Sequence, residues 1–331
     1  MITGWRIIPS STRTGITNCR NVSHARHGHG RPSSLFHRYA LLERLNAALW
    51  RFLFGPLGRI IPFGLCRVAA RPLAAIARGL GARRSIVQRN LKLAFPELGS
   101  DGITRIERAT FVNLITVFLE LITLRHLSDA ALRRRLRVHN IELLRGIGGE
   151  GALLLSGHFG NWELLALGAA AISGVPFSVV VTQQRDYGQI DRMRTSRGNR
   201  LIPTGRAARE STAILRDGGV VAMLADQSAS ERDPIVQLFG IPTHTFSAPA
   251  RLALRFRPRI IAGFAARAAD GNYDVDLMEI EHADLPDTED GARALMQRYV
   301  EQLEIAIRRH PEQWVWQHRR WKHSPGVRYD D

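Results

Sequence analysis

The sequence predicts an α/β fold: a central, mostly parallel β-sheet flanked by helices, with an N-terminal helical segment that associates with a membrane. Three observations lead to this prediction. From Gly151 onward, short apolar runs alternate with helical periods, which is typical of a parallel sheet covered by helices. Hydrophobic residues make up 45% of the 331-residue chain, enough for a large core. The residues before this region are apolar but interrupted by arginines.

Residues 1–36 are rich in Ser, Thr, Gly, Arg and His and show no sustained period. This composition predicts a disordered basic extension. Three histidines in it, His24, His27 and His29, would suit either a metal-binding tract or a solvated tail. We expect a solvated tail, because the surrounding residues carry no other ligand pattern.

Residues 37–85 are predicted to form a membrane-associating helical segment. No window between Tyr39 and Leu80 is free of charge over the ~20 residues that a membrane span needs. The apolar period indicates amphipathic helices, broken at Gly55-Pro56 and at Pro62. Helices with arginines on one side and aromatic residues on the other suit a lipid interface. The alternative is a helical cap on a soluble core.

Residues 86–331 are expected to form one domain. A helix is predicted at Asp101–Leu124, where Glu120 lies among apolar positions and is expected to be a satisfied helix carboxylate. The expected strands are Ala152–Ser156, Phe177–Thr182, Arg200–Pro203, Val220–Ala225, Arg259–Ala265 and Tyr273–Ile280. The other expected helices are Glu163–Ile172, Ile190–Ser196, Ala207–Arg216, Ser247–Phe256 and Asp287–Arg309.

The stretch Gly-His-Phe-Gly-Asn-Trp-Glu-Leu joins the first expected strand to the helix that follows it. Asn161 is a plausible cap for that helix, which places Glu163 in its first turn. From there Glu163 can reach back towards His158, and a carboxylate on one imidazole nitrogen raises the basicity of the other. The pattern indicates a general base, His158, oriented by Glu163. A buried histidine beside a capping glutamate is the alternative interpretation.

This stretch resembles the signature of the bacterial lipid A biosynthesis acyltransferases, a family in the lysophospholipid acyltransferase superfamily with its His-x4-acid motif. Other stretches resemble further blocks of the family in the same order, with Ala225 where proline is usual. They are Asn90–Glu97, Met193-Arg194 with Gly198 and Ile202-Pro203, Ala222–Gln227, Leu238–Gly240 with Ala248–Ala253, and His310–Trp316 with Arg319–Lys322. The resemblance extends from about Leu45 to Lys322.

The resemblance implies an enzyme that moves a fatty acyl chain from acyl carrier protein to a hydroxyl of a lipid A precursor. His158 would deprotonate the hydroxyl, and Glu163 would orient His158 and stabilise its imidazolium. It implies three partners at the cytoplasmic face of the inner membrane: acyl carrier protein, a glycolipid acceptor and the anionic membrane surface. We expect no cofactor and no metal, because no metal-ligand cluster is visible in the sequence. No Gly-x-Ser-x-Gly elbow is present either.

Five residues are candidates for substrate binding. Arg194 matches the family's arginine and is expected to hold a phosphate of the acceptor or of the carrier's phosphopantetheine arm; Arg197 is the neighbouring alternative. Asp226 and Gln227 end an apolar strand, where α/β folds place ligand-binding groups. Glu231 lies in the loop that follows. Solvated arginines and a strand-ending turn are the alternative interpretations.

The formal net charge is +16, and Lys92 and Lys322 are the only lysines. This excess of arginine fits either compositional bias or attraction to an anionic membrane, nucleic acid or phosphorylated substrate. Nucleic acid is disfavoured, since the arginines lack the aromatic-interleaved pattern of single-strand readers. Two other functions stay open: a phosphatidylinositol mannoside or other glycolipid or lysophospholipid acyltransferase using acyl-CoA or acyl carrier protein, and a basic membrane-binding protein without catalysis. Cys19 and Cys66 indicate no disulfide framework, which fits a reducing compartment.

Overall fold

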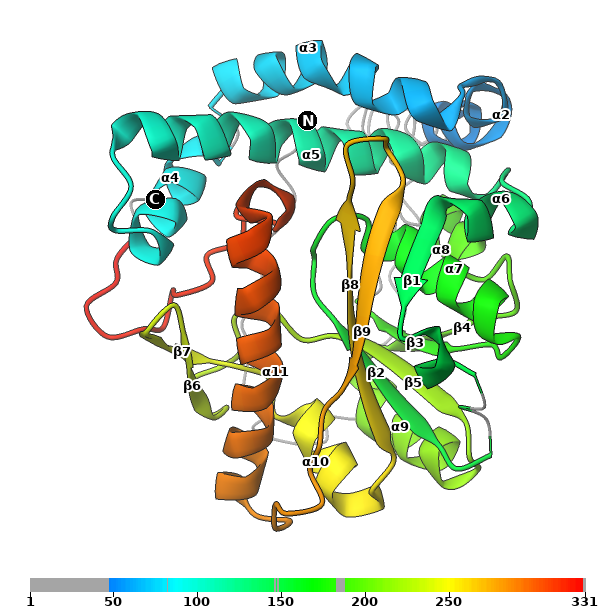
Figure 1. Cartoon of the computed structure of the whole chain (residues 1–331), viewed down its shortest axis with the longest axis vertical. Coiled ribbons are helices and arrows are strands. Elements are labelled where there is room, and N and C mark those ends of the chain that lie inside the picture. The colour runs from blue at the N-terminus through cyan, green and yellow to red at the C-terminus, as the bar shows by residue number, and fades with distance from the viewer. Residues whose placement is uncertain (1–47, 82, 146, 148, 183–187, 330–331) are drawn as a thin grey trace, which may run out of the picture. The chain divides into compact units, whose positions relative to one another are not determined.

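A seven-stranded sheet forms the centre of the computed structural model, which describes residues 48–329 except 82, 146, 148 and 183–187 (Figure 1). The strand order is β1-β9-β8-β2-β5-β3-β4. Neighbouring strands pair in parallel, except that β8 and β9 are antiparallel. The strands are β1 (Leu136–His139), β2 (Ala152–Ser156), β3 (Ser178–Val181), β4 (Arg200–Pro203), β5 (Val220–Leu224), β8 (Arg259–Arg267) and β9 (Tyr273–Glu279). The predicted α/β class with a mostly parallel sheet is confirmed.

The register of β2 and β5 positions the site described below. The two strands are neighbours, although β3 and β4 lie between them in the chain. They run parallel with Ser156 opposite Leu224. The Ala225 amide continues the ladder by donating to the Ser156 carbonyl (3.0 Å). Both strands therefore end together, and the residues that follow them emerge side by side at the carboxyl edge of the sheet.

Both faces of the sheet are covered by packed side chains. Leu153 and Leu155 of β2 belong to one buried apolar cluster, whereas Ala152 and the partly buried Leu154 belong to a second. Since successive side chains of a strand point to opposite faces, the two clusters lie on the two sides of the sheet. The helices that follow the strands or pack beside them are α7 (Trp162–Ser173), α8 (Gly188–Arg194), α9 (Ala207–Arg216), α10 (Ala248–Phe256) and α11 (Glu289–Arg309).

Four short or polar elements were not predicted from the sequence. They are α4 (Arg84–Ala94), α6 (Asp129–Arg135), β1, and the hairpin formed by β6 (Ile235–Leu238) and β7 (Ile241–His244). β1, β6 and β7 each have four residues. Pairing with neighbouring strands, rather than local pattern, makes them strands.

The long helix α5 (Ser100–Leu124) crosses the sheet at the upper end of β8, and α3 (Cys66–Gly79) lies along it (Figure 1). The fully buried carboxylate of Glu107 in α5 joins three helices. It accepts from Arg78 of α3 (2.9 Å), and from Arg84 (2.8 Å) and Gln88 (2.9 Å) of α4. A buried carboxylate with three partners satisfies its hydrogen-bonding capacity and fixes α3 on α5.

The outer side of α3 is unusually apolar. Small side chains, Cys66, Ala70 and Ala74, are buried beneath it. Large apolar side chains are exposed along and beside it: Leu65, Val68, Leu73, Ile76 and Leu80. No single helix among the described residues is long and apolar enough to cross a membrane. One bent pair, Ala48–Ile60 with Phe63–Gly79 at 110°, meets that test by length and composition together.

The expected domain boundaries fall partly outside the described residues. Residues 1–36, with their three histidines and Cys19, lie outside the described residues. The membrane-associating role of residues 37–85 and the division at residue 86 stay predictions. In the structure, residues from Trp50 onward form one compact unit.

Candidate active site

A tight turn after β2 carries His158 and leads into α7. Gly160 in this turn has φ +53°, and a Cβ there would lie 1.7 Å from the carbonyl oxygen of Ala265. A Cβ on Gly157 would lie 3.2 Å from Cγ of Asp226. The glycines thus let the backbone pass close to β8 on one side and to Asp226 on the other. Any other residue at position 160 would displace the turn that presents His158.

Asp226 holds His158 by two hydrogen bonds. The imidazole Nδ1 lies 2.8 Å from Asp226 Oδ1, and the His158 backbone N–H donates to Oδ2 (2.8 Å). An ionised carboxylate only accepts hydrogen bonds, so Nδ1 carries the proton and Nε2 has its lone pair available. The His158 side chain is 23% exposed, whereas that of Asp226 is 2% exposed. Asp226 is thus a buried acid that orients His158, and His158 is a base that solvent or a ligand can reach.

The Asp226 carboxylate stays ionised despite complete burial. Burial by itself raises its pKa, but the charge of His158 and hydrogen bonds from its ring, from Trp314 and from the His158 amide lower the pKa to about 2. The Trp314 indole Nε1–H donates to Asp226 Oδ2 at 2.8 Å. The side chain of Trp162 packs edge-on against the imidazole, with ring centroids 5.1 Å apart. Ring position and tautomer are therefore both set by protein contacts.

The expected role of Glu163 as the orienting partner of His158 is corrected by these contacts. Asn161 does cap α7 as expected, since its Oδ1 accepts from the Leu164 amide (2.9 Å), and Glu163 lies in the first turn. Its carboxylate, however, binds Arg194 of α8: Nε lies 3.1 and 3.0 Å from the two oxygens. The sequence indicated an acid five residues after His158, but the partner of Nδ1 is Asp226, which directly follows β5, the strand beside β2.

The other expected binding residues are spread more widely. Arg194 is joined to Glu163 and lies 3.5 Å from Asp191, within one helical turn. Gln227 Nε2 is 3.5 Å from His158 Nε2, too long for a firm hydrogen bond. Arg197 binds Asp129 (2.6 Å) and the Leu127 carbonyl, and the exposed Glu231 binds His323 (3.0 Å). Within the described part of the chain, the contacts of Arg197 and Glu231 do not reach His158 or Asp226, so the substrate-binding role of these two residues stays a prediction.

The C-terminal block supplies three buried or partly buried side chains that were not counted among the site residues from the sequence: Trp314, His318 and Arg320. Trp314 packs in the core and also donates to Asp226. His318 Nε2 accepts from the Ser228 amide (3.0 Å), and burial lowers the pKa of His318 to about 4. The guanidinium of Arg320 is buried and donates to the hydroxyls of Thr243 (2.8 Å) and Thr245 (2.7 Å). An indole has one polar atom, so its need for a buried acceptor was the signal available in the sequence.

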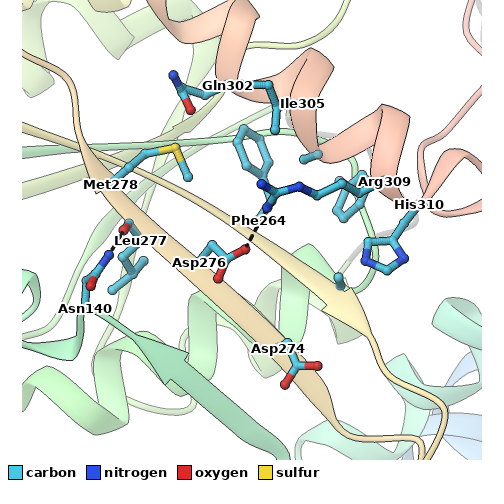
Figure 2. Close-up of a pocket in the computed structure, with 13 residues that line it drawn as sticks. Asn140, Phe264, Asp274, Asp276, Leu277, Met278, Gln302, Ile305, Arg309 and His310 are labelled. Carbon is cyan, nitrogen blue, oxygen red and sulfur yellow. Dashed lines mark hydrogen bonds and ion pairs between the residues drawn. The ribbon is translucent and has the colours of Figure 1, made fainter.

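A cavity of about 420 Å³ lies between β9 and α11, beside the turn that carries His158 (Figure 2). Phe159, Phe264 and Ile305 contribute apolar walls, while Asp276 and Arg309 form an ion pair at 3.6 Å. The neighbouring Phe159 lines this cavity, but the His158 ring does not. The cavity therefore adjoins the histidine turn without containing the reactive nitrogen.

Among residues 48–329 with their gaps, no three or more His, Cys, Asp or Glu side chains are grouped so as to hold a metal ion. His158 and Asp226 form a two-member pair in which the histidine nitrogen nearest to the acid is already hydrogen-bonded. The geometry is that of an acid–base pair.

Comparison with known proteins places this geometry in a family. A family model described as bacterial lipid A biosynthesis acyltransferase matches residues 29–323. The chain belongs to this family. It is also 25% identical over 256 residues to the lipid A biosynthesis lauroyltransferase of Escherichia coli (strain K12), covering 75% of this chain and 82% of that protein. The chain is thus an acyltransferase of lipid A biosynthesis. His158 lies in the stretch Gly157–Leu164 and Asp226 in the block Ala222–Gln227, two of the stretches that resemble the family.

Proposed function

We propose that this acyltransferase transfers a fatty acyl chain from acyl carrier protein to a hydroxyl of a lipid A precursor, at the cytoplasmic face of the inner membrane. The relative is named a lauroyltransferase, so we propose a lauroyl chain as the first acyl group to test. The observation that carries the proposal is the 2.8 Å contact between His158 Nδ1 and Asp226, which leaves Nε2 free of that acid in a side chain that is 23% exposed. A base of this kind removes a hydroxyl proton without a metal or a covalent enzyme intermediate.

The proposed reaction is a direct transfer. His158 Nε2 takes the proton of the acceptor hydroxyl as its oxygen attacks the thioester carbonyl. The new ester C–O bond forms, the C–S bond breaks, and the imidazolium returns the proton to the departing thiolate. During this step His158 is positively charged, and the ionised Asp226 beside Nδ1 stabilises that charge. Because the pKa of Asp226 is about 2, the carboxylate is charged at any physiological pH.

Glu163 and Arg194 have a different proposed role. Their ion pair joins the first turn of α7 to the end of α8, and both side chains are mostly buried, at 7% and 18% exposed. Through it Glu163 positions Arg194, whose guanidinium suits a phosphate of the acceptor or of the donor arm. Gln227, near Nε2, is placed to contact the attacking oxygen. Arg197 and Glu231 stay candidates for the outer part of the acceptor.

Membrane attachment is proposed for the segment that contains α3. The exposed apolar side chains beside its arginines are the arrangement that lies in a lipid interface. The net charge of +16 adds attraction to anionic lipid.

The proposal is tested with the full chain purified in nanodiscs. Acyl carrier protein loaded with a lauroyl chain and a lipid A precursor are supplied, and the product is identified by mass spectrometry. We expect His158→Ala to lower the rate at least 1,000-fold, while His139→Ala, which changes an exposed histidine of β1, keeps the parent rate. Parent-like transfer by His158→Ala would refute the mechanism. Transfer only from acyl-CoA, or only to another glycolipid, would refute the donor or the acceptor.

A further inference from the structure

A second cavity, of about 320 Å³, lies between α3, the α5 helix and the turn that joins β8 to β9. It is lined by Arg67 and Arg71 of α3, by Arg135 at the end of α6, and by Arg267 at the end of β8. Its lining carboxylates, Glu120 and Asp270, already bind arginines: Glu120 binds Arg267, and Asp270 binds Arg137 at 2.6 Å. The cavity therefore has more cationic than anionic side chains around it, and both of its carboxylates already form ion pairs with arginines.

Several contacts hold Arg267 in a fixed position in the wall of this cavity. Its side chain is 7% exposed, its Nη1 binds Glu120, and its guanidinium lies over the Tyr273 ring, 4.7 Å from the centroid. The Gln313 side-chain amide binds the Arg267 backbone twice: its Oε1 accepts from the Arg267 N–H (2.6 Å), and its Nε2 donates to the Arg267 carbonyl (2.9 Å). Within the part of the chain that the structure describes, the buried Nη2 has no hydrogen-bond partner. Burying a guanidinium N–H without an acceptor costs folding free energy. An acceptor supplied by a bound ligand would remove that cost.

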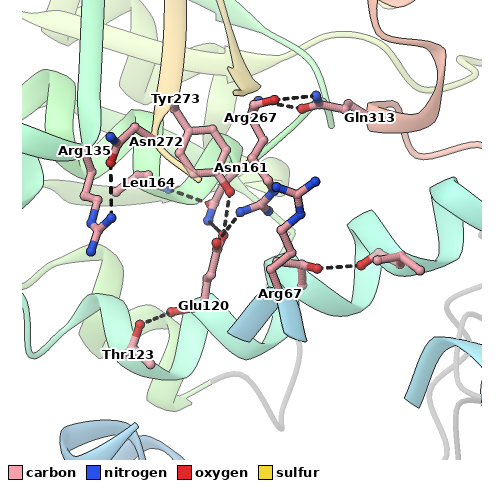
Figure 3. Close-up of polar contacts among 12 residues, drawn as sticks. Arg67, Glu120, Thr123, Arg135, Asn161, Leu164, Arg267, Asn272, Tyr273 and Gln313 are labelled. Carbon is pink, nitrogen blue, oxygen red and sulfur yellow. Dashed lines mark hydrogen bonds and ion pairs between the residues drawn. The ribbon is translucent and has the colours of Figure 1, made fainter. Parts of the chain in front are cut away.

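The polar groups behind Arg267 are mutually satisfied, so they do not compete for a ligand. Glu120 accepts from Asn161 Nδ2 (2.8 Å) and from the Tyr273 hydroxyl (2.5 Å), as Figure 3 shows. Burial, with the charge of Glu120, raises the pKa of Tyr273 well above its ordinary value, so the phenol remains a donor. The expectation that Glu120 is a satisfied helix carboxylate is confirmed. It anchors Arg267 and leaves one edge of the guanidinium available.

The remaining arginines approach from the apolar side of the molecule. Arg67 and Arg71 are exposed residues of α3, and Arg67 Nη1 donates to the Ala269 carbonyl (3.1 Å). Val68, which also lines the cavity, is 60% exposed and continues the apolar surface of α3. The cavity mouth thus combines guanidinium groups with exposed apolar surface. That combination fits an anionic head group whose chains extend along α3.

We propose that this cavity binds a phosphate group of a membrane lipid, with Arg267 as its buried donor and Arg67 and Arg71 as the donors at its mouth. Guanidinium groups match phosphate oxygens in geometry as well as charge. The site is separate from His158, which does not line it. It would hold the enzyme on the bilayer in a defined orientation, and it does not depend on the acyl-transfer proposal.

The test is calorimetric titration of the full chain in neutral detergent. Two probes are used: dihexanoyl phosphatidic acid below its critical micelle concentration, and inorganic phosphate. Arg71→Ala should weaken binding of the lipid about tenfold, the loss expected for one charge-assisted contact. The matched control is Arg59→Ala, which removes an exposed arginine outside the cavity. Since the probes form no surface, general attraction to a charged membrane does not contribute.

Each outcome decides the proposal. Tighter binding of phosphatidic acid than of inorganic phosphate, with loss in Arg71→Ala only, supports a lipid phosphate. Equal binding of both probes would overturn the lipid source and leave a site for free phosphate. Absence of binding by the parent protein, or equal losses in Arg71→Ala and Arg59→Ala, would overturn the site. Acyl transfer is not measured, so failure here and failure of the proposed reaction are distinguishable.

Discussion

Trp314 and His158 share one acceptor atom: the indole N–H and the His158 backbone N–H both donate to Asp226 Oδ2, each at 2.8 Å. Oδ1 is left for the imidazole. The carboxylate is therefore fixed by two donors on one oxygen while the other oxygen orients the ring. This arrangement joins β2, β5 and the C-terminal block, and it makes Asp226 the residue whose substitution should be most informative.

Asp226→Asn should lower kcat by roughly 1,000- to 10,000-fold with little change in KM. The Asn oxygen can still accept from Trp314 and the His158 amide, but its NH₂ group then faces Nδ1. That contact forces the proton onto Nε2 and removes the base. Steady-state kinetics with a circular dichroism check of folding would measure it. As a control, Asp191→Asn should keep at least a tenth of the parent kcat. A parent-like kcat in Asp226→Asn would exclude Asp226 as the orienting acid.

The same carboxylate predicts a pH dependence of stability. Its pKa is lowered from 3.8 to about 2 on folding, so Asp226 contributes stability above its unfolded pKa and loses that contribution as pH falls through the folded value. The size is roughly 2 kcal/mol. Urea unfolding of the parent and of Asp226→Asn between pH 7 and pH 2 would isolate it. Their difference should shrink below about pH 4; a constant difference would contradict the assignment.

Glu163 and Arg194 should behave as one unit. Glu163→Gln and Arg194→Gln should each lower kcat/KM, and the double substitution should cost little more than either single one, because the first already breaks the contact. The coupling in unfolding free energy should be roughly 1–3 kcal/mol. A double-mutant cycle by denaturation and kinetics would measure both. Additive losses would mean that the two side chains act separately.

Gly160→Ala should prevent folding or cost more than about 3 kcal/mol, because its Cβ would meet the Ala265 carbonyl oxygen at 1.7 Å. Gly174 offers a matched control: it also has positive φ, +71°, but a Cβ there meets nothing within 4 Å. Gly174→Ala should cost only about 1 kcal/mol. Thermal unfolding of both variants separates backbone strain from the close approach. Equal costs would show that the contact with Ala265 relaxes.

Val68→Ser with Ile76→Ser should weaken binding to anionic vesicles about tenfold, since two exposed apolar side chains of α3 would no longer enter the interface. Ile235→Ser, which removes an exposed isoleucine of β6, is the matched control and should leave binding unchanged. Vesicle co-sedimentation measures the effect. If Ile235→Ser lowered binding as much as the α3 variant, the interface would not be α3.

Local sequence patterns were sufficient to predict six of the seven strands of the sheet. β2 and β4 have the bounds expected from their apolar runs, and β3, β5, β8 and β9 differ only at their ends. β2, β5 and β8 are buried along most of their length, and β9 alternates between buried and less buried residues, so the patterns of these strands are visible in the sequence. β1 was not predicted, because Arg137 separates its two apolar residues and leaves no apolar run; it is an edge strand that pairs with β9. Its strand conformation depends on a partner more than 130 positions away in the chain.

The sequence by itself determined that His158 follows a buried strand in a glycine-containing turn, with Asn161 capping the next helix. Those features depend on residues within a few positions of each other. Only the tertiary structure decided which acid serves the histidine. The order of strands is a long-range property, and it places β5 rather than β3 beside β2. With Ser156 opposite Leu224, the residues two positions beyond each strand end, His158 and Asp226, meet. Glu163, nearer in sequence, lies in the first turn of α7 and binds Arg194 instead.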